Sequence, residues 1–82
     1  MSNHQLDARL LLCPLPVIRT QDQIENLNDG DVLTVKCTDP GTLNDIPTWC
    51  RIHGHTLVRS ETEGREQIFT IRVRKMHQFS AL

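Results

Sequence analysis

The sequence predicts an α/β fold, a two-layer sandwich in which two helices cover one face of a mixed four-stranded sheet. Three observations predict it: the element order βαβαββ, strands that are apolar on one face only, and two amphipathic helices between strands. A helical crossover makes the first two strands parallel, and a tight turn makes the last two an antiparallel hairpin. With 82 residues, we expect one domain over 1–82, with its core at 4–75 and a flexible tail at 76–82.

The first half of the chain contains two strand patterns and one helix pattern. We expect a strand at 4–8, a helix at 14–28 and a second strand at 32–38, with turn residues at 28–31 before the second strand. Val17, Ile24 and Leu27 recur at helical spacing in this helix, with Ile18 beside them. The second strand alternates, with Leu33, Val35 and Cys37 on its apolar face.

The second half is expected to begin with a short turn at 40–44 and a helix at 46–53, ended by Gly54. The helix is placed after the turn because an interior Pro47 would break a helix that ran straight from residue 40. Its expected core face consists of Ile46, Trp49, Cys50 and His53. Two strands follow, at 55–61 and 66–74, joined by a tight turn at Glu63-Gly64.

Composition narrows the function classes. Lys plus Arg total 9 and Asp plus Glu total 10, so a net charge of −1 gives no general attraction to nucleic acid or an anionic membrane. We therefore expect no direct nucleic-acid binding and no membrane partner. Three cysteines, an odd number, and an N-terminus without signal-peptide features predict a protein of the reducing cytoplasm.

One cysteine stands out, in Cys13-Pro14-Leu15-Pro16, directly before the first helix pattern. Proline is tolerated in a first helical turn, so Cys13 is expected to be the N-cap. There the helix dipole and free amide hydrogens would lower the pKa of the thiol moderately and favour the nucleophilic thiolate. The alternative is a small buried hydrophobic residue at a helix start that happens to contain prolines.

Several short motifs follow one another along the chain. They are Leu6-Asp7-Ala8-Arg9, Cys13-Pro14-Leu15-Pro16, Gly30-Asp31, Thr38-Asp39-Pro40-Gly41, Asp45-Ile46-Pro47 with Trp49-Cys50, and Gly54-His55. Together they span roughly residues 6–75 and resemble the TusA (SirA-like) sulfur-carrier family. The resemblance implies a cytoplasmic βαβαββ protein whose CPxP cysteine carries sulfur as a persulfide.

Carried over to this sequence, the resemblance makes Cys13 the sulfur-bearing residue, with Pro14 and Pro16 completing the motif. It implies a cysteine desulfurase or a rhodanese as donor and a DsrE-type protein as acceptor, toward thiolation of tRNA uridine or dissimilatory sulfur metabolism. Exchange at sulfur needs no metal or organic cofactor. Such a protein is a sulfurtransferase that carries a persulfide rather than a stand-alone enzyme, and it is expected to be monomeric when free.

Two residues near the motif carry further expectations. The family usually has glycine three residues before the cysteine, where this chain has Leu10, and the change could alter the loop or the partner surface. Arg9 supports the motif if its charge acts on the thiol; otherwise it is a solvated loop residue.

The remaining candidates are first interpreted as structural. Cys37 and Cys50 are expected in the packing, and a resolving-thiol role for Cys50 would require disulfide reach to Cys13. Cys50, His53 and His55 lack the second ligand pair typical of a zinc site. Trp49 is expected to anchor the second helix. The basic strand end is either a solvated face or a docking patch for an acidic partner, and it consists of Arg72, Arg74 and Lys75.

Three functions remain open from the sequence. The first is sulfur transfer through Cys13. The second is a non-catalytic regulatory or interaction module of the same fold, in which Cys13 is structural and the surface around Leu10 binds a partner. The third is a peroxide-sensing thiol, which would need a resolving partner.

Overall fold

The computed structural model describes residues 2–75, so the tail predicted at 76–82 lies outside the described residues. The described chain contains four strands and two helices in the order that the sequence predicts. They are β1 (Asn3–Ala8), α1 (Leu15–Glu25), β2 (Val32–Cys37), α2 (Thr42–His53), β3 (Thr56–Glu63) and β4 (Glu66–Arg72). Neither helix is long and apolar enough to cross a membrane.

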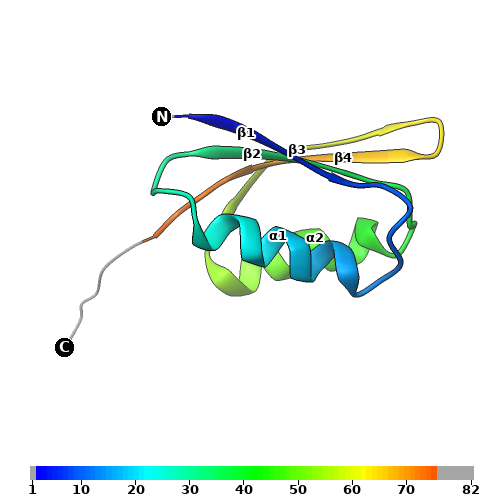
Figure 1. Cartoon of the computed structure of the whole chain (residues 1–82), viewed down its shortest axis with the longest axis horizontal. Helices are drawn as coiled ribbons and strands as arrows, with labels where there is room; N and C mark the ends of the chain where they lie inside the picture. The colour runs from blue at the N-terminus through cyan, green and yellow to red at the C-terminus, as the bar shows by residue number, and fades with distance from the viewer. Residues whose placement is uncertain (1, 76–82) are drawn as a thin grey trace.

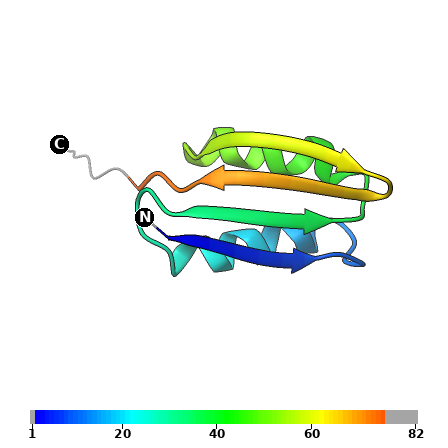
Figure 2. The ribbon, with the colours of Figure 1, turned by 90° about the horizontal axis from the view of Figure 1, so that it is seen from above.

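The four strands form one mixed sheet in the order β1-β2-β4-β3, as Figure 2 shows. β1 runs parallel to β2, with Leu6 opposite Val35, and β2 runs antiparallel to β4, with Val35 opposite Phe69. β3 and β4 form an antiparallel hairpin whose last pair is Glu63 with Glu66. The predicted pairing of the strands is therefore confirmed.

Both helices lie on the same face of the sheet, which gives the two layers seen in Figure 1. The core fills the space between the layers and contains the alternating apolar residues of the central strands. Those with no exposed surface include Leu33, Val35, Cys37, Phe69 and Ile71. The fold class and the apolar face of the second strand are therefore confirmed.

Helix α1 is shorter at its end than the predicted 14–28 and has a partly polar buried face. It ends at Glu25, and the carbonyls of Glu25 and Leu27 accept hydrogen bonds from Nζ of Lys75, at 3.2 and 2.5 Å. Its buried residues include Pro16 and Thr20, whose hydroxyl donates to the carbonyl of Pro16 at 2.8 Å. Because this bond satisfies the hydroxyl, a polar residue can occupy a core position of the helix.

The prediction that Pro47 separates a turn from the second helix is wrong, because α2 runs continuously from Thr42 to His53. Thr42, Ile46 and Cys50 recur every four residues and are almost fully buried, at 0, 0 and 1% exposure. Burial of this stripe outweighs the missing hydrogen bond of one proline. His53, expected on the core face, is exposed instead, and Gly54 ends the helix in the left-handed conformation with a φ of 79°.

Candidate functional site

Cys13 lies in the loop that leads from the carboxyl end of β1 into α1. It is the exposed cysteine of the three, whereas Cys37 and Cys50 are buried. The expectation that Cys13 caps α1 is wrong, because Pro14 occupies the N-cap and Cys13 precedes it. The backbone N–H of Leu15, at the start of the helix, donates to the carbonyl of Leu12 at 2.9 Å and is therefore used within the loop. The Cys13–Pro14 peptide bond is cis.

Asp39 ties the Cys13 loop to the segment before α2. One of its carboxylate oxygens accepts the backbone N–H of Cys13 at 2.7 Å, and the other accepts the N–H of Gly41 at 3.0 Å. These two backbone donors hold the pKa of Asp39 below its ordinary value. Asp39 is therefore an anion, and it fixes the position of the Cys13 backbone.

Asp45, in the first turns of α2, contacts the sulfur itself. The thiol of Cys13 donates a hydrogen bond to Oδ2 of Asp45. This bond, together with partial desolvation and the charges of Asp45 and Asp39, raises the pKa of Cys13 to about 11. The expected moderate lowering of the thiol pKa is therefore wrong for the free protein, because two carboxylates, rather than helix amides, surround the sulfur.

Asp39 and Asp45 were not predicted from the sequence as site residues. Both stand in motifs that contribute to the family resemblance, Thr38-Asp39-Pro40-Gly41 and Asp45-Ile46-Pro47, but no chemical role was predicted for either aspartate. The signal that could have found them is topological. β2 is parallel to β1, so the segment after β2 must lie beside the segment after β1.

A shallow groove of about 350 Å³ opens beside the thiol, between α1 and α2. Its lining residues come from the beginning of α1 and from one face of α2. They are Pro14, Val17, Asn44, Asp45, Thr48, Trp49 and Ile52. Large apolar side chains are also exposed in the Cys13 loop and on both helices: Leu10 and Leu12 in the loop, Leu15 and Ile18 on α1, and Leu43 and Ile52 on α2. Such a concentration of exposed apolar surface is typical of a protein-interaction site.

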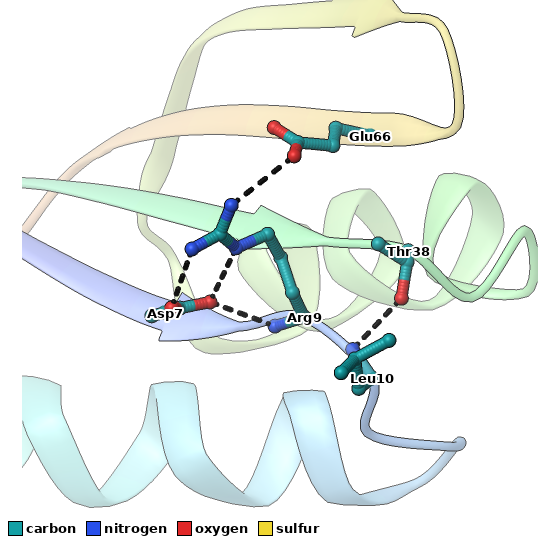
Figure 3. Close-up of polar contacts among 5 residues, drawn as sticks. All are labelled: Asp7, Arg9, Leu10, Thr38 and Glu66. Atoms are coloured by element: carbon teal, nitrogen blue, oxygen red, sulfur yellow. Dashed lines mark hydrogen bonds and ion pairs between the residues drawn. The ribbon is translucent and has the colours of Figure 1, made fainter.

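Figure 3 shows that Arg9 turns toward two carboxylates. Its guanidinium contacts Asp7 at 2.9 Å and Glu66 at 3.2 Å, which links the end of β1 to the start of β4. It has no hydrogen bond or ion pair with Cys13 among the described contacts. The charge of Arg9 is thus balanced by Asp7 and Glu66.

Leu10 adopts a backbone conformation that suits glycine. Its φ is 66°, its side chain is 88% exposed, and its N–H donates to the hydroxyl of Thr38 at 2.8 Å (Figure 3). A left-handed φ is costly for a residue with a branched side chain. The backbone at residue 10 therefore makes a left-handed turn, a conformation that glycine adopts without this cost.

The other candidates occupy structural positions. Burial raises the pKa values of Cys37 and Cys50 to about 11, and both belong to the core cluster. Trp49 packs against that core, with the rings of His53 and His55 at 4.7 and 5.2 Å from it. Within residues 2–75, His, Cys, Asp and Glu side chains do not gather in groups of three that could hold a metal ion.

The basic strand end has a role within the fold. Besides the bonds to α1, the backbone N–H of Lys75 donates to Asp29 at 2.8 Å, and the N–H of Arg74 donates to Nδ1 of His55 at 3.1 Å. These contacts attach the end of β4 to the end of α1 and to the start of β3. Arg72 and Arg74 keep exposed side chains, so the predicted docking patch stays a prediction for them.

The chain is thus a small α/β sandwich with one exposed thiol, the cysteine of its CPxP motif, and this thiol lies beside two carboxylates. The family model described as Sulfurtransferase TusA matches residues 4–75, nearly the whole chain. The chain therefore belongs to the TusA sulfurtransferase family. That membership assigns it a general role as a sulfur carrier that acts with other proteins.

Proposed function

We propose that this protein carries sulfane sulfur as a persulfide on Cys13. The observation that carries the proposal is the position of Cys13: an exposed thiol, in a loop fixed by Asp39, at the edge of a groove with exposed apolar neighbours. The two other thiols are buried, which favours Cys13 as the one that meets a partner. Pro14 and Pro16 shape the chain after the sulfur, and Pro16 is also part of the core layer.

The transfer is an exchange at sulfur. Cys13 loses its thiol proton and its sulfur attacks the outer sulfur of a donor persulfide; the donor S–S bond breaks, and the donor leaves as a thiolate that takes up a proton. The net reaction converts a thiol and a donor persulfide into a Cys13 persulfide and a donor thiol, without net oxidation. An acceptor thiolate then removes the outer sulfur from Cys13 in the same way.

For the partners we propose a cysteine desulfurase or a rhodanese as donor and a DsrE-type protein as acceptor. The relay would serve either thiolation of tRNA uridine or dissimilatory sulfur metabolism, in a reducing cytoplasm. The exposed apolar residues around Cys13 support docking of a folded protein, because small-molecule sulfur alone would not require them.

The test is to incubate the protein with a cysteine desulfurase and labelled cysteine and to measure intact mass. A gain of about 32 Da per sulfur atom is expected for the wild type, for Cys37→Ser and for Cys50→Ser, and not for Cys13→Ser. A rhodanese with thiosulfate replaces the desulfurase if no adduct forms. Sulfur retained in Cys13→Ser, or no adduct from either donor, would overturn the proposal and favour the interaction module.

A further inference from the structure

The groove beside Cys13 combines an apolar wall with one charged side chain. Val17, Trp49 and Ile52 provide apolar surface, and Asp45 is the charged residue of its lining. The same Asp45 accepts the hydrogen bond of the thiol, so whatever enters the groove meets the group that holds the Cys13 proton. The groove and the reactive sulfur are therefore connected through one carboxylate.

The negative charge at this site has no counter-ion in the described part of the chain. The ion pairs within residues 2–75 join His4 to Asp31 and Arg9 to Asp7 and Glu66, and none includes Asp39 or Asp45. Asp45 on α2 and Asp39 in the loop before it are the charged groups that act on the thiol, and both oppose its ionisation. A nucleophilic thiol is normally found beside positive charge.

We propose, on the basis of the proposed function, that the groove receives a lysine or arginine side chain of the sulfur donor. This basic side chain pairs with Asp45 and releases the Cys13 thiol for attack. A basic side chain fits both parts of the groove, because its aliphatic stem covers apolar surface while its charged end reaches the carboxylate. Trp49 adds an aromatic wall that favours a cation.

In the free protein, the hydrogen bond to Asp45 holds the Cys13 thiol in its protonated form. With a thiol pKa of about 11, only a small fraction of Cys13 is thiolate near neutral pH, so the free carrier reacts slowly with oxidants and unrelated electrophiles. A cation on Asp45 weakens the acceptor of the S–H bond and offsets the charge that opposes ionisation. Activation then occurs only in the complex, and the net transfer keeps the proton balance given above.

Matched disulfides test the groove without any protein partner. Cystamine carries a cation near its S–S bond, and hydroxyethyl disulfide is a neutral compound of similar size. For each protein, the rate of mixed-disulfide formation at Cys13 is measured by mass spectrometry of the Cys13 peptide, and the cystamine rate is divided by the neutral rate. The ratio cancels changes that affect both reagents equally.

We expect the ratio to fall by about threefold to fivefold in Asp45→Asn, which is the size expected for one exposed ion pair. Asp22→Asn, an exposed carboxylate of α1 with the same change of charge, is the matched control and should keep the wild-type ratio. An unchanged ratio in Asp45→Asn, or an equal fall in Asp22→Asn, would overturn the proposal.

A second variant supplies the cation within the chain. Thr48 lines the groove three residues after Asp45 on α2, so Thr48→Lys places an ammonium group beside the carboxylate, and Thr48→Gln is the neutral control. Lowering the thiol pKa from about 11 to its ordinary 9 gives about 100-fold more thiolate, offset by about tenfold lower nucleophilicity. Iodoacetamide labelling of Cys13 at pH 8 should therefore rise by up to about tenfold in Thr48→Lys alone.

These outcomes are separable from those of the proposed function. Labelling of Thr48→Lys at the rate of Thr48→Gln overturns the groove proposal even when a desulfurase still loads sulfur onto Cys13. With a desulfurase as donor, loading of the wild type should also slow with added salt more steeply than loading of Asp45→Asn. Equal salt dependence would mean that the donor brings no cation to Asp45 and would likewise overturn it.

Discussion

The two ends of the sheet use aspartate in different ways. At the start of β2, the carboxylate of Asp31 accepts the backbone N–H groups of Ser2 at 3.1 Å and Asn28 at 2.9 Å, and it lies 3.7 Å from Nε2 of His4. At the opposite end, Asp39 also holds backbone donors, but the side chain of Asp45 holds a thiol.

The difference shows how the same side chain becomes structural or chemical. Asp31 is largely buried, at 6% exposure, and its donors belong to the backbone, so its proton and charge states are fixed by the fold. Within residues 2–75, the side chain of Asp45 has one hydrogen-bond donor, the Cys13 thiol, whose proton leaves during the proposed reaction. A partner protein can therefore change the protonation state of the Cys13–Asp45 pair, whereas the fold sets that of Asp31.

The largest expected effect on stability comes from a substitution in the hydrophobic core, which lies between the two ends of the sheet. Ile46 follows Asp45 directly and has no exposed surface, so Ile46→Ala should lower the free energy of unfolding by about 2–5 kcal/mol. Ile52, on the same helix, is 71% exposed, and Ile52→Ala should change it by about 0.5 kcal/mol or less. Urea denaturation of both variants gives the comparison.

Sulfur loading should show the reverse order at a temperature where both variants are folded. Ile52 lines the groove, so Ile52→Ala should slow transfer from a protein donor more than Ile46→Ala does. A larger loss of stability in Ile52→Ala would contradict the assignment of Ile46 to the core and of Ile52 to the partner surface.

The second prediction compares the aspartates directly. Asp31→Asn should lower the melting temperature at pH 7, because one carboxylate oxygen becomes an amide that cannot accept a backbone N–H. Asp45→Asn should lower it less, because its side chain bonds to no backbone group among the described residues. Differential scanning calorimetry of the two variants provides the measurement.

Acidification gives the sign of the Asp31 contribution. The backbone hydrogen bonds lower the pKa of Asp31 below its ordinary value of 3.8. Its stabilising effect is therefore fully present above pH 3.8 and is lost as the pH falls through the lower, folded-state pKa. The difference between wild type and Asp31→Asn should shrink as the pH falls below 3.8, and a constant difference would contradict this account.

The sequence predicted the layers better than the site. Alternation in β2 and β4 is a local pattern, and it identified the apolar faces of the core strands. The apolar spacing of α1 found Ile24 but included the exposed Ile18 and missed the buried Pro16 and Thr20. The contact between Cys13 and Asp45 joins residues 32 positions apart, and no local pattern encodes which of several exposed aspartates reaches a thiol. The continuous α2 was missed because propensity at Pro47 was weighed without the buried stripe on which the helix packs.

The third prediction concerns strain at the reactive end. Leu10→Gly should raise the free energy of unfolding by about 1 kcal/mol, since glycine adopts the φ of 66° without the steric cost of a side chain. Leu12→Gly is the matched control: Leu12 is also exposed, at 73%, but its φ is not positive, so the variant should not be stabilised. Equal effects of the two substitutions in urea denaturation would argue against strain at Leu10.

The smallest expected effect is that of Arg9. Because its guanidinium is bound by Asp7 and Glu66, Arg9→Ala should leave the rate of sulfur loading and the labelling rate of Cys13 within about twofold of wild type. The comparison with Asp45→Asn is informative, since both changes alter one charge near the same loop and only the carboxylate contacts the sulfur. A clear loss of loading in Arg9→Ala, with normal iodoacetamide labelling, would instead place Arg9 on the donor-binding surface. A small effect of Arg9→Ala would show that a charge must contact the sulfur to change the reactivity of Cys13. Closeness along the chain would not be enough.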